Sequence, residues 1–380
     1  MSFSSLGLSP SLLKTLKAQK YEYPYPIQQK AIPAILNKAD VLGIAKTGTG
    51  KTVSFVIPVL RNLQRSRDTK NRHVNVLVLV PTRELAEQVK NVFQKFGSVI
   101  PERIKTLAVY GGVSINPQMQ ALQGVNIVVA TPGRLLELVE KNAVHLSKVS
   151  TLVIDEADRM LQMGFKDEMS RIYDLLPAQR QNLLFSATLN EEVLNVKELL
   201  LNDPEIIKVE ENESKVELIE QVAYFIDEEK KGPLLRYLIK SNELKQVLVF
   251  VSSAFKADSV VTKLSNNGIK ATAIHGKKAQ GARTKALERF KSGQINVLVT
   301  TDLLARGIDI DFLPCVINYE LPRSPKDYIH RIGRTGRADS SGQAISIISP
   351  EEEHHFKIIQ KKMGKWVDRI NGEQINLHGY

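Results

Sequence analysis

Short, strongly apolar segments that alternate with amphipathic segments constrain the fold of this chain more than any other feature. Near-continuous apolar runs are typical of strands that are buried on both faces of a parallel sheet, and the amphipathic segments between them have the pattern of covering helices. The predicted strands of the first half are Val41–Ile44, Val76–Val80, Lys105–Val109, Ile127–Ala130, Thr151–Ile154 and Asn182–Phe185. Those of the second half are Gln221–Phe225, Gln246–Val251, Lys270–Ile274, Val297–Thr300, Cys315–Tyr319 and Gly342–Ile348. The sequence therefore predicts an α/β fold.

The series of strands and helices occurs twice, which predicts two domains of similar architecture. A chain of 380 residues is long enough to form two hydrophobic cores. A polar and acidic segment, residues 208–214, separates the two series and has the composition of a linker. We predict a first domain over residues 1–208, a linker over 209–217, a second domain over 218–366 and a tail over 367–380.

A glycine-rich loop follows the first predicted strand, where residues 45–52 read Ala-Lys-Thr-Gly-Thr-Gly-Lys-Thr. A loop of this kind directs backbone N–H groups and a helix N-terminus toward a phosphate chain. Lys51 can then reach the terminal phosphates, and the Thr52 hydroxyl can hold Mg²⁺. Ala45 stands where the general phosphate-loop pattern has glycine, so the loop taken alone is also compatible with an ordinary surface turn.

An acidic cluster after a second buried strand supports the phosphate-binding interpretation. Residues 155–158 read Asp-Glu-Ala-Asp and directly follow Thr151–Ile154. Parallel strands deliver the residues at their carboxyl ends to one crevice. The two segments together predict that the chain binds and hydrolyses a nucleoside triphosphate.

The charge of the chain is positive in both halves. The net charge is +11; residues 1–210 carry 26 basic and 20 acidic side chains, and residues 211–380 carry 26 and 21. An excess shared by both halves suits an anionic polymer that contacts both. An ordinary basic protein is the alternative explanation.

Several classes of protein do not fit this sequence. No apolar run approaches the roughly 20 residues of a membrane span, and the first residues lack a secretory signal. Cys315 is the only cysteine, which excludes an intramolecular disulfide and a cysteine-rich metal site. We expect it to be a buried, apolar residue of its strand. These features favour a reducing cytoplasm and no membrane association.

Further sequence blocks appear in a fixed order along the chain. They are Pro24–Gln28, Pro81–Ala86, Gly111-Gly112, Thr131–Arg134, Ser186–Thr188, Gln280 with Arg283, Asp302, Ala305–Asp309 and His330–Arg337. Together with the glycine-rich loop and the acidic cluster, this set resembles the DEAD-box ATP-dependent RNA helicases over nearly the whole chain. The compact core is similar to bacterial RhlE-like members. The resemblance implies two tandem RecA-like domains, each a mainly parallel sheet flanked by helices.

The resemblance also implies an ATP site that uses Mg²⁺. Gln28 would pair with the adenine edge, because its amide carries both a donor and an acceptor, and Tyr21 would stack on the base. Most members have Gly-Phe where this chain has Lys20-Tyr21. The implied nucleotide-binding residues are Tyr21, Gln28, Thr47, Gly48, Thr49, Gly50, Lys51, Thr52 and Asp309. The implied metal-holding residues are Thr52 and Asp155.

The implied catalytic residues come from both domains and are Lys51, Asp155, Glu156, Arg334 and Arg337. Asp155 would hold Mg²⁺ through water, and Glu156 would polarise the attacking water. On a helix, Arg334 and Arg337 would share one face and point at the γ-phosphate as an arginine finger. Asp158, Ser186, Thr188 and His330 would couple the state of the nucleotide to contact between the domains.

Polar residues at strand ends and helix starts are implied to bind the RNA backbone. They are Pro81, Thr82, Arg83, Gly112, Thr131, Arg134, Gly276, Arg283 and Thr300. Each of them is also compatible with an ordinary structural cap. Aromatic residues make up only 6% of the chain, so no aromatic-rich platform is evident. We therefore expect recognition to depend little on base sequence and to use the 2′-OH to select RNA.

The predicted function is that of an ATP-dependent RNA helicase. RNA-stimulated hydrolysis at the inter-domain cleft would drive local unwinding of short duplexes or remodelling of RNA–protein complexes, and we expect a monomer. One alternative is an ATP-gated RNA clamp or scaffold with little unwinding. A DNA helicase or translocase is a second alternative.

Overall fold

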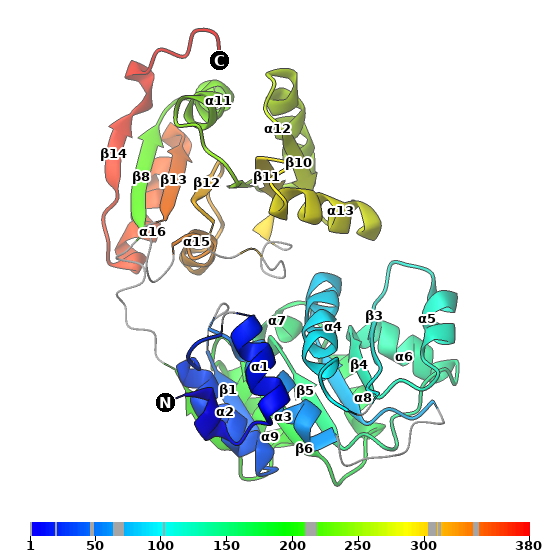
Figure 1. The fold of residues 1–380 in the computed structure, drawn as a ribbon. Coiled ribbons are helices and arrows are strands. Elements are labelled where there is room, and N and C mark those ends of the chain that lie inside the picture. The colour runs from blue at the N-terminus through cyan, green and yellow to red at the C-terminus, as the bar shows by residue number, and fades with distance from the viewer. Residues whose placement is uncertain are drawn as a thin grey trace. The chain divides into compact units, whose positions relative to one another are not determined.

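The computed structural model describes residues 2–19, 21–45, 49–63, 72–101, 103–209, 219–302, 310, 313–336 and 342–380. The chain divides into two compact units, Met1–Glu210 and Glu211–Tyr380, and each contains one sheet (Figure 1). The predicted linker over residues 209–217 lies almost entirely outside the described residues.

The first unit is built on a seven-stranded parallel sheet in the order β3-β4-β2-β5-β6-β1-β7. Its strands are β1 Val41–Ile44, β2 Val76–Leu79, β3 Thr106–Val109, β4 Ile127–Ala130, β5 Thr151–Ile154, β6 Gln181–Ser186 and β7 Glu205–Lys208. Its helices are η1 Phe3–Leu6, α1 Pro10–Ala18, α2 Pro26–Leu36, α3 Lys51–Leu63, α4 Arg83–Gly97, α5 Ile115–Ala121, α6 Pro132–Glu140, α7 Ala157–Gln162, α8 Lys166–Asp174 and α9 Glu191–Leu200.

Two apolar cores cover the two faces of this sheet. Alternate residues of one strand point to opposite faces, so Val76 and Val78 belong to the core under α1–α4, whereas Leu77 and Leu79 belong to the core under α6–α9. Because both faces are buried, polar groups of the strands reach the surface only at the strand ends.

The second unit repeats the same strand order, β10-β11-β9-β12-β13-β8-β14, and all its strands are parallel. Its strands are β8 Glu220–Phe225, β9 Val247–Phe250, β10 Ala271–Ile274, β11 Val297–Thr300, β12 Cys315–Asn318, β13 Gln343–Ile348 and β14 Asp368–Asn371. Its helices are η2 Glu228–Lys230, α11 Lys231–Ser241, α12 Ala254–Asn266, α13 Gln280–Lys291, α15 Pro325–Ile332, η3 Pro350–Glu352, α16 Glu353–Met363 and η4 Gly372–Gln374. Helices α11 and α12 pack on one face, and α13, α15 and α16 pack on the other.

The prediction of an α/β fold with two parallel sheets is confirmed, and two edge strands extend it. Strand β7 lies beside β1, and β14 lies beside β8. Residues 367–380, which the sequence predicted to be a tail, contribute β14, and Ile375 and Leu377 pack against the core of the second unit. Cys315 is buried in β12, and burial raises the pKa of its thiol to about 12.

No helix within the described ranges is long and apolar enough to cross a membrane.

Close packing explains why residue 43, inside β1, is a glycine. A Cβ atom at this position would lie 2.6 Å from the ring of Phe185, which is fully buried and packs against Phe55 at 5.3 Å between ring centroids. A larger residue would therefore displace the aromatic ring that fills this part of the core.

We predict that Gly43→Ala destabilises the first unit by about 1–3 kcal/mol, because the added methyl group overpacks the core. Thermal unfolding followed by circular dichroism should show an earlier melting step. Gly97→Ala is the matched control, since its Cβ would meet only Leu60 at an ordinary 3.7 Å. Equal melting curves for the two variants would contradict the packing argument.

Candidate active site

Three neighbouring strands bring the predicted nucleotide-binding segments together. Strands β5, β6 and β1 are adjacent, and all three end at the same edge of the sheet. The acidic cluster follows β5, Ser186 ends β6, and the glycine-rich loop follows β1. The three segments therefore follow strand ends at one edge of the sheet, as expected for parallel strands, which align their carboxyl ends.

Lys51 is the first residue of α3 and is only 6% exposed. Its Nζ atom has no hydrogen-bond partner among the described residues. A buried ammonium without a partner is costly, and it is the group expected to gain most from an anionic ligand. Thr52 follows it and is half-buried, whereas Thr47 and Gly48 lie outside the described residues.

Gln28 braces the glycine-rich loop from α2. Its Oε1 atom accepts a hydrogen bond from the Tyr25 N–H at 2.9 Å, and its Nε2 atom donates to the Gly50 carbonyl at 3.1 Å. Gly50 has φ +83°, and a Cβ there would lie 2.4 Å from Gln28 Nε2. The side chain is fully buried, and these two hydrogen bonds leave one N–H and one lone pair of the amide. Pairing of these remaining groups with adenine stays a prediction.

Tyr21 packs on the hydrophobic core of the first unit. Its ring lies 6.4 Å from that of Phe96, between centroids, and is partly buried against this core. The ring keeps some exposure, so stacking on a base remains a prediction for this residue.

Asp155 is buried directly after β5, and its environment makes ionisation of the carboxyl group less favourable than in water. Burial is the main cause that raises the pKa of this carboxyl group to about 6; the charges of Glu156 and Asp158 act in the same direction, while Lys51 and the Glu156 N–H lower it. The N–H of Glu156 donates to Asp155 Oδ1 at 2.9 Å. A cation beside this carboxyl group would favour its ionised form, so the assignment of Mg²⁺ to Asp155 and Thr52 stays a prediction.

Glu156 has an unusual backbone conformation and forms an ion pair that the sequence did not predict. Its φ of 56° lies in the left-handed region, which is a costly conformation for a residue with a side chain and one that occurs at functional sites. Its Oε2 atom accepts from Arg159 Nη1 at 3.1 Å, and both side chains are nearly buried. The spacing of three residues on α7 was the only signal in the sequence for this contact.

Asp158 contacts the turn after β6. The Thr188 hydroxyl donates to Asp158 Oδ2 at 2.9 Å, and the Ser186 hydroxyl donates to the Thr188 carbonyl at 2.7 Å. The acidic cluster and the Ser186–Thr188 turn are therefore joined directly. Their role in coupling, and that of His330 on α15, stays a prediction.

The predicted RNA contacts of the first unit follow the other three neighbouring strands, β3, β4 and β2. The residues are Pro81, Thr82, Arg83, Gly112, Thr131 and Arg134. The Thr82 hydroxyl accepts from the Leu85 N–H at 3.3 Å and so also caps α4. Gly112 has φ +73°, and a Cβ there would lie within 2.3 Å of the Arg83 guanidinium. Arg134 donates to the Val113 carbonyl at 2.9 Å, which fixes the same loop.

The predicted contacts of the second unit occupy the equivalent strands. Gly276 follows β10, Arg283 lies on α13, and Thr300 ends β11. Arg283 and Thr300 are buried, and Gly276 is exposed. Their assignment to RNA remains a prediction.

The expectation that Arg334 and Arg337 share one helical face needs correction. Helix α15 ends at Ile332, and Gly333 is its C-cap. Gly336 has φ +82°, a conformation that cannot continue a helix. Arg334 therefore lies in a turn after the helix, where it is buried, and Arg337 and Asp309 lie outside the described residues.

Arg331 is a second buried residue that the sequence analysis left without a role. Its guanidinium donates to both carboxylate oxygens of Asp302, at 2.5 and 2.8 Å, and to Asn318 at 3.1 Å. It also lies 4.8 Å from the centroid of the Phe250 ring. Arg331 thus fixes the segment after β11 to α15, and nothing in its immediate sequence distinguished it from its neighbours.

We predict that Asp155→Asn stabilises the protein free of nucleotide and Mg²⁺ at neutral pH while abolishing ATP hydrolysis. The pKa of about 6 lies above the ordinary 3.8, so the contribution of Asp155 to stability is full below about pH 4 and is lost as the pH rises through about 6. The neutral amide avoids this loss, which is on the order of 2–3 kcal/mol.

Thermal unfolding at several pH values with a chelator present measures this effect. The melting temperature of Asp155→Asn should exceed that of the wild type at pH 7.5, and the difference should shrink as the pH falls toward 5. Asp174→Asn removes an exposed carboxylate of α8 and serves as the control. A difference that grows at low pH would refute the assignment of a raised pKa.

Comparison with known proteins gives a consistent result. Residues 25–196 match the family described as DEAD/DEAH box helicase, and residues 229–339 match the helicase conserved C-terminal domain. The chain is 38% identical over 369 residues to the DEAD-box ATP-dependent RNA helicase CshA of Geobacillus kaustophilus, covering 97% of this chain and 78% of the relative. Identity to CshA of Bacillus subtilis is also 38%, over 97% of this chain and 74% of the relative. The narrower similarity to RhlE-like members stays a prediction.

Solved structures are similar over the whole chain. Dbp5 of S. cerevisiae bound to RNA and ADP BeF3 matches with a TM-score of 0.84 at 32% identity, covering 98% of this chain and 96% of that one. A DEAD box protein from Methanococcus jannaschii matches with a TM-score of 0.55 at 37% identity, over 98% and 99% of the two chains.

Proposed function

Because the chain belongs to the DEAD-box family of ATP-dependent RNA helicases, we propose that it hydrolyses ATP at the carboxyl ends of β1, β5 and β6. It is an enzyme that uses ATP and binds RNA. The observation that carries the assignment of the site is the buried Lys51 Nζ atom, which has no hydrogen-bond partner among the described residues and whose charge acts on Asp155. The β- and γ-phosphates of ATP would supply the missing partner.

Mg²⁺ would be held by Asp155, through water, and by the Thr52 hydroxyl. Bound there with ATP, the ion would neutralise charge on the phosphates. Asp155 would be ionised in that state, because a neighbouring cation favours the carboxylate.

Glu156 would orient and polarise the water that attacks the γ-phosphate. Arg159 holds one oxygen of its carboxylate at 3.1 Å, which leaves the other oxygen available as an acceptor. Arg334 and Arg337 would stabilise the charge of the transition state as arginine fingers once ATP and RNA are both bound. The contact between Asp158 and Thr188 would report the nucleotide state to His330.

RNA would bind along the carboxyl ends of β3, β4 and β2 in the first unit and of β10 and β11 in the second. Helix N-termini, arginines and glycine backbone groups suit phosphate and sugar contacts, so the affinity should depend on salt and little on base sequence. Binding of one strand in a bent form would exclude its complement and separate a short duplex locally. We further propose that the protein acts as a monomer in the cytoplasm.

We predict that Glu156→Gln retains binding of ATP and RNA but lowers ATP turnover by at least about 100-fold, because an amide keeps the shape and loses the basic lone pair. The ATP–RNA complex should then accumulate, and a filter-binding chase should show slower release of RNA. Glu192→Gln, an exposed change on α9, is the control. Release of RNA at the wild-type rate would remove Glu156 from this role.

A strand-displacement assay tests the proposed activity against its alternatives. We expect a short RNA duplex to separate with ATP and to remain paired without it. An ATP-gated clamp would retain RNA with ATP but leave the duplex paired. Equal stimulation of the ATPase by DNA and RNA of the same length would favour the DNA helicase instead.

A further inference from the structure

Phe255 is a large apolar side chain held in water at the carboxyl end of the second sheet. It is 83% exposed, more than any other large hydrophobic residue among those the structure describes. Leaving a phenylalanine in water forgoes the favourable burial that most such residues achieve. Phe255 is the second residue of α12, which starts at Ala254, four residues after β9 ends at Phe250.

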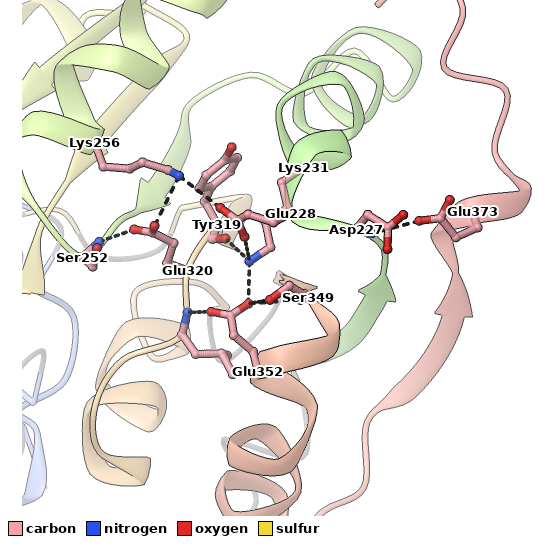
Figure 2. A network of polar contacts seen from close by, with 11 residues as sticks. Asp227, Glu228, Lys231, Ser252, Lys256, Tyr319, Glu320, Ser349, Glu352 and Glu373 are labelled. Carbon is pink, nitrogen blue, oxygen red and sulfur yellow. Dashed lines mark hydrogen bonds and ion pairs between the residues drawn. The ribbon is translucent and has the colours of Figure 1, made fainter.

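The turn that carries Phe255 is fixed on both sides of it, as Figure 2 shows for Ser252 and Lys256. The Ser252 N–H donates to Glu320 at 2.6 Å, and the Lys256 N–H donates to the Ser253 hydroxyl, which caps α12, at 3.1 Å. The Lys256 ammonium bonds Glu228 at 3.1 Å and lies 5.5 Å from the centroid of the Tyr319 ring. Phe255 therefore projects from a turn that hydrogen bonds fix on both sides.

One helical turn further along α12, Asp258 joins this helix to the loop after β10. Its carboxylate contacts His275 Nε2 at 3.0 Å and Lys278 Nζ at 2.8 Å. Residues three apart on a helix are neighbours, so the loop that Asp258 contacts, which contains Gly276 and the exposed Lys277, is attached to α12 one helical turn from Phe255. Gly276 is one of the proposed RNA contacts.

The turn after β2 in the first unit is equivalent to the turn after β9, and it carries proposed RNA contacts. Strands β2 and β9 occupy the same place, third, in the two sheet orders. Each is followed by a helix that a hydroxyl caps, Thr82 for α4 and Ser253 for α12. In the first unit this turn carries the proposed RNA contacts Thr82 and Arg83, whereas the second unit presents an aromatic ring there.

We propose that Phe255 is a stacking site for one base of the bound RNA strand. This inference rests on the proposed binding of RNA at the carboxyl ends of the strands, and it adds a contact to a base where the other contacts go to the backbone. Every base has a flat π-face, so such a contact tolerates any sequence. A nucleic acid suits the site better than an apolar protein partner, because Asp258, one helical turn along from Phe255, is paired with Lys278, and the neighbouring Lys277 is exposed.

The experiment compares Phe255 variants by titration of a short fluorescent oligoadenylate in the presence of a non-hydrolysable ATP analogue. Phe255→Ala and Phe255→Leu should weaken binding by about 5- to 100-fold, and Phe255→Trp should bind as the wild type does. Trp366→Ala is the matched control, because Trp366 is 72% exposed but precedes β14, at the amino ends of the strands. Wild-type affinity of Phe255→Ala would overturn the proposal.

A second measurement separates stacking from an indirect effect. An abasic nucleotide is moved along the strand, and at one position it should weaken wild-type binding while leaving Phe255→Ala unaffected. A loss in Phe255→Ala that stays the same at every abasic position would also overturn the proposal. If the wild-type chain itself did not bind oligoadenylate with the analogue present, the proposed RNA-binding function would fail, and this inference with it.

Discussion

Burial of both faces of a parallel sheet is the constraint on which the rest of this structure depends. Such a sheet offers functional side chains only at the ends of its strands, and parallel pairing brings all the carboxyl ends to one edge. In the first unit this edge is divided between two groups of strands. The turns after β5, β6 and β1 hold the candidate nucleotide site, and those after β3, β4 and β2 hold the proposed RNA contacts. One sheet edge could thus carry both proposed sites without any change to the core.

The nucleotide site is costly for the protein when it holds no ligand. A buried lysine has no hydrogen-bond partner in the described part of the chain, a buried aspartate has a raised pKa, and Glu156 has a left-handed backbone. Each feature opposes stability, and sites of this kind are where local rules of folding are broken for function. A bound nucleotide with its cation would relieve the first two, which couples ligand binding to the stability of the first unit.

A polar network in the second unit joins several elements near the start of α12. Lys231 is almost fully buried, yet it contacts Glu228, Glu352 and the Tyr319 carbonyl, and the network continues to Lys256 and Glu320 (Figure 2). These pairs join α11, the end of β12, η3 and the start of α12. A polar network in which the charges have partners fixes the local backbone. The turn after β9 can therefore hold the Phe255 ring in an exposed position.

The sequence by itself determined the strands whose apolar runs are buried, to within a residue or two at each end, and the segments that follow them. It did not predict β7 and β14, because edge strands such as Asp368–Asn371 are mostly exposed and lack the apolar pattern. Only the tertiary structure showed that Gln28 braces Gly50, that Arg159 pairs with Glu156 and that Arg331 pairs with Asp302. It also placed the end of α15 before Arg334. Periodicity records which side chains avoid water, whereas the partners of a buried polar group depend on residues that only folding brings together.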